Sequence, residues 1–185
     1  MHKTLLFGAI ALLSACSEKP ATPAQPAAPP PKAAPHAEST PPVAAALSAS
    51  GVAGIRFGMT LAQAEQAAGA KASLPTPLDP ACSMVRFPTL PKLRFMVEQG
   101  VVTRADAEAG VENALGLVVG DTLAQVRAAH PEAQFTPHKY DQQGQYGTFP
   151  NADGRAAVIL EASGGKVTKI RAGLQPAVAY VETCG

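Results

Sequence analysis

A short motif that occurs twice constrains the fold of this chain more than any other feature. Residues 58–64 read Gly-Met-Thr-Leu-Ala-Gln-Ala, and residues 120–126, 62 positions later, read Gly-Asp-Thr-Leu-Ala-Gln-Val. A second match, between residues 102–107 and 167–172, has an offset of 65 positions. Two matches in the same order and at nearly the same spacing predict a duplicated structural unit. Chance similarity in an alanine-rich chain is the alternative.

Each copy of the motif has the pattern that begins a helix. Thr60 and Thr122 are favourable N-caps, and a glutamine follows each of them at the capping-box spacing of three residues. The glycine before each cap permits the tight turn that leads into the helix. Gly69 ends the first helix and Pro131 ends the second, so both helices are expected to be short.

After each helix the pattern changes to the period of two that is typical of strands. The alternation covers residues 93–98 and 101–106 in the first half, and residues 156–161 and 167–172 in the second. Further strands are expected near residues 83–87, 146–149 and 177–183. The predicted fold class is α+β, with two tandem helix-plus-antiparallel-meander repeats, over about 51–115 and about 116–185.

Residues 17–50 do not have the composition of a folded domain. They hold nine of the eighteen prolines and no aromatic residue, so they bury too little apolar surface to offset the entropy lost on ordering. We expect a disordered Pro/Ala-rich tether that reaches roughly 100 Å when fully extended. The globular domain is then residues 51–185, whose twelve Lys and Arg balance twelve Asp and Glu. This balance gives no general attraction for nucleic acid, so no nucleic-acid partner is expected.

The N-terminus has the features of an export signal. Lys3 precedes nine apolar residues, 5–13, whereas a helix that spans a bilayer needs about twenty. Residues 13–16, Leu-Ser-Ala-Cys, resemble the lipobox of bacterial lipoproteins, in which the signal is removed and the cysteine is acylated. An ordinary signal with a chance cysteine is the alternative.

The lipobox resemblance implies where the protein resides. Residues 1–15 would be the signal peptide, and residues 16–50 the tether, lipidated on Cys16. Ser17 stands where inner-membrane lipoproteins carry a retaining aspartate. The expected location is therefore the outer membrane, with the domain facing the periplasm and the lipid as the membrane contact.

Two cysteines remain in the globular domain, Cys82 and Cys184. In an oxidising periplasm an even pair predicts a disulfide. It would close a loop of about 100 residues and contribute up to about 4.7 kcal/mol on the chain-entropy model. A reactive thiol or a metal ligand is the alternative, but there is no nearby histidine cluster in the sequence, and no metal or cofactor is expected.

The lipobox, the tether and the Gly-Met-Thr-x-x-Gln-x helix opening resemble small outer-membrane lipoproteins of the BamE/OmlA type. Two such units in one chain resemble the β-lactamase-inhibitor-protein fold, in which tandem helix-and-sheet repeats form a concave sheet. The resemblance covers residues 58–68 and 120–129 and the order of elements. The chain departs from the single-unit assembly lipoproteins in being duplicated, and no partner-contacting residue of either family can be matched. The resemblance implies a protein-binding surface.

Residues 137–146 are the stretch densest in polar and aromatic side chains. Tyrosine rings stack on sugars and polar side chains bind their hydroxyls, so this loop is a candidate glycan site; an ordinary surface loop is the alternative. The candidate residues are His138, Tyr140, Asp141, Gln145 and Tyr146.

The sheet face opposite the helices is a second candidate surface. The alternation directs one set of side chains toward the helices: Phe95, Val97, Thr103, Ala105, Val158, Leu160, Thr168 and Ile170. The opposite face then carries Arg94, Met96, Arg104, Lys169 and Arg171. A basic, partly apolar face of this kind suits a protein partner, with a solvated face as the alternative.

The sequence contains no Gly-x-Ser-x-Gly elbow, His-Glu-x-x-His motif, phosphate loop or dinucleotide fingerprint, so an enzyme is not expected. His130 is expected to have a structural role at a helix end, and residues 151–154 read as a turn rather than a calcium loop. The predicted role is protein binding in the cell envelope, as an assembly factor or an inhibitor of an envelope enzyme. A carbohydrate-binding module that uses the 138–146 loop on a glycan is the alternative, and a hydrolase ranks third.

Overall fold

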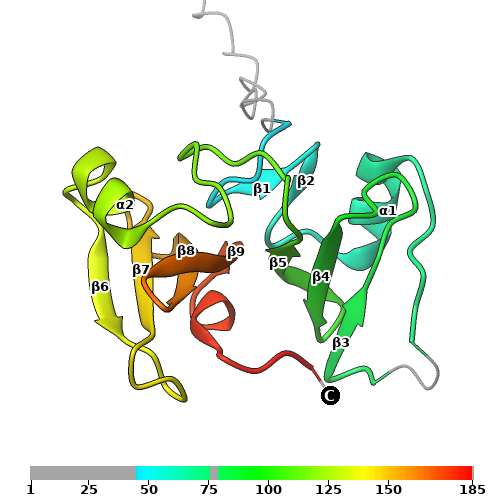
Figure 1. Ribbon diagram of the computed structural model, residues 1–185. Helices are drawn as coiled ribbons and strands as arrows, with labels where there is room; N and C mark the ends of the chain where they lie inside the picture. The colour runs from blue at the N-terminus through cyan, green and yellow to red at the C-terminus, as the bar shows by residue number, and fades with distance from the viewer. Residues whose placement is uncertain (1–44, 76–78, 185) are drawn as a thin grey trace, which may run out of the picture. The chain divides into compact units, whose positions relative to one another are not determined.

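The computed structural model describes residues 45–75 and 79–184 (Figure 1). The predicted signal peptide, Cys16 and most of the predicted tether lie outside these residues. Neither helix of the described part has the length and apolar character needed to cross a lipid bilayer. The elements are β1 (Gly51–Val52), β2 (Ile55–Arg56), α1 (Leu61–Ala68), β3 (Cys82–Val85), β4 (Leu93–Glu98), β5 (Val101–Ala107), α2 (Leu123–Ala129), β6 (Gln134–Pro137), β7 (Gln145–Pro150), β8 (Ala156–Ser163), β9 (Lys166–Leu174) and the 3-10 helix η1 (Ala177–Ala179).

The described fold is mostly β, so the predicted α+β class with two helix-plus-meander repeats is wrong. Seven strands form one antiparallel sheet in the order β3-β4-β5-β9-β8-β7-β6, and β1 pairs with β2. The helices have only eight and seven residues, with one fully buried side chain each, Ala64 and Val126. The halves also differ, because three strands of the large sheet follow α1 and four follow α2.

The prediction was wrong for two reasons: the helices supply less of the core than it assumed, and it did not include strand β6. The capping residues predict where each helix starts but not how little of the core it supplies, and the strands supply most of that core. Strand β6 is an exposed edge strand in which only Phe135 packs against the core. A strand with one apolar contact produces no alternating pattern, so the sequence did not predict it.

One face of the large sheet carries the hydrophobic core. Six directly paired residues cross six strands in a row, namely Val85, Phe95, Ala105, Ala172, Val158 and Phe149. All six are buried. The helices lie on either side of the molecule's centre, α1 near β4 and β5 and α2 near β6 and β7 (Figure 1). The two strands that join the halves are β5 and β9, which pair over four residues each.

Both helices start as the motif predicts. The Thr60 hydroxyl accepts a hydrogen bond from the backbone N–H of Gln63, and the Gln63 side chain accepts one from the backbone N–H of Thr60. Thr122 and Gln125 form the same capping box at the second helix. The first helix ends at Gly69 in the left-handed conformation, as expected.

The turns before the helices are also equivalent. The N–H of Gly58 donates to the carbonyl of Val102, and the N–H of Gly120 donates to the carbonyl of Val167, both at 2.8 Å. The sequence motif therefore reports a repeated local arrangement in which a helix start is bonded to a strand of the sheet.

A β-bulge lies at the same place in each half and changes the predicted alternation. The pairing skips Thr103 on β5 and Thr168 on β9. As a result, Val102 and Val167 are fully buried in the core, whereas Thr103 and Thr168 stay outside it. The predicted packing of these threonines in the core is not observed, since Thr103 is half-buried and Thr168 is exposed. The bulge gives each strand an extra residue, and the valine before the threonine fills the core position instead.

The predicted last strand, residues 177–183, is absent from the described chain. Its place is taken by η1, from which Val178 packs against Ala157 and Ile159 on the outer face of the sheet, opposite the helices. Polar backbone groups in this stretch bond to arginine side chains of the sheet and not to a neighbouring strand. We refer to residues 175–184 as the C-terminal segment.

The structure pairs Cys82 with Cys184 in a disulfide, as the even cysteine count predicts, with 5.4 Å between the Cα atoms. It ties the end of the C-terminal segment to the edge strand β3.

Residues 151–154 form the expected turn, in which the N–H of Gly154 donates to the carbonyl of Asn151 at 3.0 Å. His130 has the expected structural setting, with Nε2 3.0 Å from the carbonyl oxygen of Leu115.

Candidate functional site

The outer face of the sheet carries a cluster of charged side chains next to the C-terminal segment. Arg94, Asp106 and Arg171 are direct neighbours across β4, β5 and β9. Glu161 and Lys169 are direct neighbours across β8 and β9. Direct partners in an antiparallel sheet point to the same face, so the strands bring these charges together.

The structure places all four predicted basic residues of this face around one cleft, but it does not leave them all in solvent. Arg104 and Arg171 each expose only 3% of their surface, and Met96 exposes 1%. The sequence predicted that this basic face would be open. It is partly covered, because the C-terminal segment lies over this part of the sheet. Lys169 remains mostly exposed at the rim.

Arg104 joins the sheet to the C-terminal segment. Its Nε donates to Asp106 at 2.6 Å, and its Nη1 donates to the carbonyl oxygen of Tyr180 at 2.7 Å. A buried guanidinium must have its N–H groups and its charge compensated. Here a carboxylate of the same strand and a backbone carbonyl of the segment do so.

Arg171 makes the second connection. Its Nε donates to the carbonyl oxygen of Val178 at 2.7 Å, and its Nη1 forms an ion pair with Glu161. Lys169 approaches the other oxygen of Glu161 at 3.2 Å, and Nε2 of His138 lies 3.8 Å from it. Glu161 is thus a buried carboxylate shared by several donors.

The pKa values of the pair reflect these surroundings. Burial raises the pKa of Glu161, but the positive charges and hydrogen bonds of Arg171 and Lys169 more than offset it, so the net pKa lies below the usual value. Burial and the nearby charge of Arg104 lower the pKa of Arg171 from its usual value. Two guanidinium groups are therefore held close together in a partly dehydrated place.

Between the sheet and residues 181–184 lies a cleft of about 550 Å³. Its charged lining residues are Arg94, Arg104, Lys169, Arg171, Asp106, Glu161 and Glu182. Four of these are basic and three are acidic. Arg94 is different from the others, because its Nε is buried and has no hydrogen-bond partner among the described residues.

The predicted glycan-binding loop is stabilised by its own polar groups. His138 stacks on Tyr146 with 4.5 Å between ring centroids, and its Nδ1 accepts from the backbone N–H groups of Tyr140 and Asp141, each at 3.1 Å. Asp141 also accepts from the Ser163 hydroxyl at 2.6 Å, which is the largest cause of its lowered pKa.

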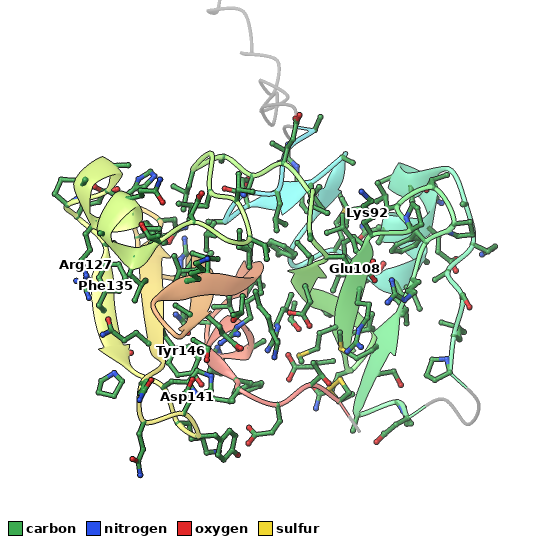
Figure 2. The ribbon with its side chains drawn as sticks, viewed as in Figure 1. Lys92, Glu108, Arg127, Phe135, Asp141 and Tyr146 are labelled. Atoms are coloured by element: carbon green, nitrogen blue, oxygen red, sulfur yellow. A yellow bond between two sulfur atoms is a disulfide. The ribbon has the colours of Figure 1, made fainter. Side chains whose placement is uncertain are left out.

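The remaining two candidates of the loop face different partners. The side-chain oxygen of Gln145 accepts from Arg127 of α2 at 2.6 Å, and the Arg127 guanidinium lies over the ring of Phe135, 3.7 Å from its centroid (Figure 2). The Tyr140 hydroxyl donates to Glu182, which Lys139 also contacts at 2.9 Å. These two bonds hold the pKa of Glu182 down at about 2. The loop thus contacts the C-terminal segment.

Four residues of the cleft region were missed by the sequence interpretation: Asp106, Glu161, Tyr180 and Glu182. Glu161 carried a usable signal, since it is the one charged residue in the otherwise apolar run 156–162. A lone acid among buried apolar residues indicates a compensated buried charge. The other three carried no local signal, because their roles depend on the path of the C-terminal segment.

Comparison with known proteins finds no matching family model, no similar curated protein and no similar solved structure. The family resemblance therefore stays a prediction, and functional conclusions depend on the chemistry of the cleft.

Proposed function

We propose that the protein is a lipid-anchored lipoprotein of the cell envelope that binds another envelope protein with the face formed by the cleft and the C-terminal segment. The observation that carries this proposal is the pair of exposed tyrosines beside the cleft. Tyr140 exposes 66% of its surface and Tyr180 exposes 41%. Both are connected to the charged cluster, Tyr140 through Glu182 and Tyr180 through Arg104.

The composition of this face supports a protein partner. Tyrosine, with tryptophan and arginine, is among the residues most enriched at the energetic centres of protein interfaces, because it combines apolar area with a directional hydrogen bond. An unsupported loop would lose much of this energy to ordering on binding. Here the disulfide and the two arginine-to-carbonyl bonds hold the C-terminal segment in place beforehand.

The carbohydrate alternative receives less support from the same region. Of the five loop residues predicted to bind a glycan, His138, Asp141 and Gln145 already use polar atoms to stabilise the loop or to contact α2. A sugar would have to compete with these bonds. The exposed ring of Tyr140 is equally suited to a protein surface.

The test is a photocrosslinking experiment in cells that produce the full-length protein. A benzophenone amino acid replaces Tyr180, and in a matched control it replaces Val118, which exposes 56% of its surface in another part of the domain. We expect a discrete protein adduct from position 180 alone. The adduct is identified by mass spectrometry and the partner is then purified.

The purified partner gives the quantitative result. Tyr180→Ala should weaken its affinity for the full-length protein by a factor of at least about ten, the range of an interface hot spot, and Val118→Ala should leave the affinity unchanged. Equal effects of the two substitutions would contradict the proposal. So would binding to a glycan array that depends on Tyr140 and Tyr146, which would establish the carbohydrate alternative.

A further inference from the structure

We propose that the cleft beside Arg94 is an oxyanion site, which takes a carboxylate or phosphate group of the bound molecule. This inference names the chemistry recognised at the proposed binding face. It rests on the proposed function only for the identity of the larger molecule that carries the anion.

Arg94 supplies the first argument. A buried N–H group without an acceptor is unfavourable, and native proteins leave few such groups unpaired. The acid directly across the sheet from Arg94 is Asp106, whose Oδ1 accepts from Nε of Arg104 at 2.6 Å, and neither of its oxygens accepts from Nε of Arg94. The N–H group at Nε of Arg94 therefore has no hydrogen-bond acceptor within the described part of the chain. Arg94 also lines the cleft, so an oxyanion held there lies beside its guanidinium and reaches Nε once the side chain rotates.

The charge balance of the cleft supplies the second argument. Among the described residues, its lining has four basic and three acidic side chains, an excess of one positive charge. Glu182, one of the three acids, is also engaged by Lys139 from outside the cleft, which leaves still less negative charge for the arginines. The pKa of Arg171 is lowered first by burial and then by the positive charge of Arg104, as expected for like charges beside one another. An anion would be attracted here and would relieve this repulsion.

Size and geometry supply the third argument. At about 550 Å³ the cleft is within the range of sites that hold small ligands or part of a larger one. It is much larger than a single carboxylate, so it has room for more of the bound molecule than the anionic group alone. A guanidinium presents planar paired donors that match carboxylate and phosphate oxygens, which a lysine does not.

The experiment is an NMR titration of the full-length protein in detergent micelles. Sodium acetate and sodium phosphate are added separately, at an ionic strength kept constant with sodium chloride. We expect saturable shifts at the backbone amides of Arg94, Asp106 and Arg171 with one of the two anions. Tighter binding of acetate assigns a carboxylate ligand, and tighter binding of phosphate assigns a phosphate ligand.

The decisive comparison is between Arg94→Gln and Arg155→Gln. Arg155 is an exposed arginine that pairs with Asp153 at 2.7 Å outside the cleft. Arg94→Gln should weaken anion binding at least tenfold and leave the melting temperature unchanged or higher, because it removes an unpaired buried donor. Arg155→Gln should leave binding unchanged. Arg94→Lys, which keeps the charge but loses the planar donors, should also weaken binding.

Several results would overturn the inference. Non-saturable shifts with both anions, or equal binding by Arg94→Gln and Arg155→Gln, would remove the site. A large loss of stability in both Arg94 variants would show that Arg94 has a structural role instead. If the partner crosslinked at position 180 binds Arg94→Gln with full affinity, the proposed function holds and the oxyanion site does not.

Discussion

At the scale of single residues, Glu161 organises the outer face of the sheet. Its carboxylate is buried, yet it meets the side chains of Arg171, Lys169 and His138. A buried ion pair of this kind does not by itself stabilise a fold, because desolvation offsets the attraction between the charges. Removing one partner is nevertheless costly, because the other charge stays buried.

Glu161→Gln should therefore lower the free energy of unfolding at neutral pH by up to about 3–5 kcal/mol. The net pKa of Glu161 is lowered in the folded protein, so its ionisation stabilises the fold above the unfolded pKa of about 4.3. That contribution is lost as the pH falls through the lower, folded-state pKa. Urea unfolding of both proteins from neutral pH to below pH 4 measures this dependence.

We expect the free energies of unfolding of wild type and Glu161→Gln to differ most at neutral pH. The difference should shrink as the pH is lowered. Asp153→Asn is the control, because Asp153 is a partly exposed acid whose pKa is also lowered, mainly by hydrogen bonds from Arg155. Its effect on stability should be small, as for surface pairs in general. A constant difference between wild type and Glu161→Gln across the pH range would show that the ionisation of Glu161 does not contribute.

At the scale of elements, the two helices show which features can be predicted from a short stretch of sequence. Thr60 and Thr122 form complete capping boxes, and the helices end where the sequence predicts. These features depend on bonds between residues three or four positions apart, so a single stretch of sequence contains all the partners. The bulges at Thr103 and Thr168 depend on the neighbouring strand, and the alternating pattern did not reveal them.

Thr60→Ala and Thr122→Ala should each lower the free energy of unfolding by about 0.5–2 kcal/mol, since each removes the acceptor for one helix N–H. The two costs should be similar, because the caps have the same hydrogen bonds. They should also add in the double variant, since Figure 1 places α1 and α2 at different ends of the large sheet. Chemical denaturation measures all three variants.

Substitution by serine controls for the loss of the methyl group, because serine keeps the capping hydroxyl. Thr60→Ser and Thr122→Ser should retain most of the stability. If the alanine variants unfold at the same denaturant concentration as wild type, the capping boxes do not contribute in solution.

At the scale of the whole molecule, the predicted lipid anchor can be tested separately from the domain. Residues 13–16 predict acylation of Cys16, and this part of the chain lies outside the described residues. Cys16→Ser should prevent lipidation and leave a precursor or a soluble product, because serine has no thiol to accept the diacylglycerol. Cell fractionation and intact-mass measurement show the result. A processed Cys16→Ser protein that still fractionates with the membrane would contradict the anchoring prediction.

The sequence by itself determined the features whose causes are local. It predicted the two capped helices, the strands β4, β5, β8 and β9 to within two residues, and the pairing of the two domain cysteines. Periodicity, capping residues and an even cysteine count each act within one stretch or by simple elimination. For the same reason it placed Arg94, Arg104, Lys169 and Arg171 on one face of the sheet.

Only the tertiary structure decided what covers that face. The C-terminal segment forms η1 and an irregular stretch in place of a strand, because it bonds to the side chains of Arg104 and Arg171. Arg104 lies 76 residues from its partner Tyr180, and Arg171 lies 7 residues from its partner Val178. Side-chain-to-backbone bonds of this kind leave no periodic pattern. Burial of the two arginines and the cleft itself depend on the path of this segment. An open basic face thereby becomes a partly enclosed charged site.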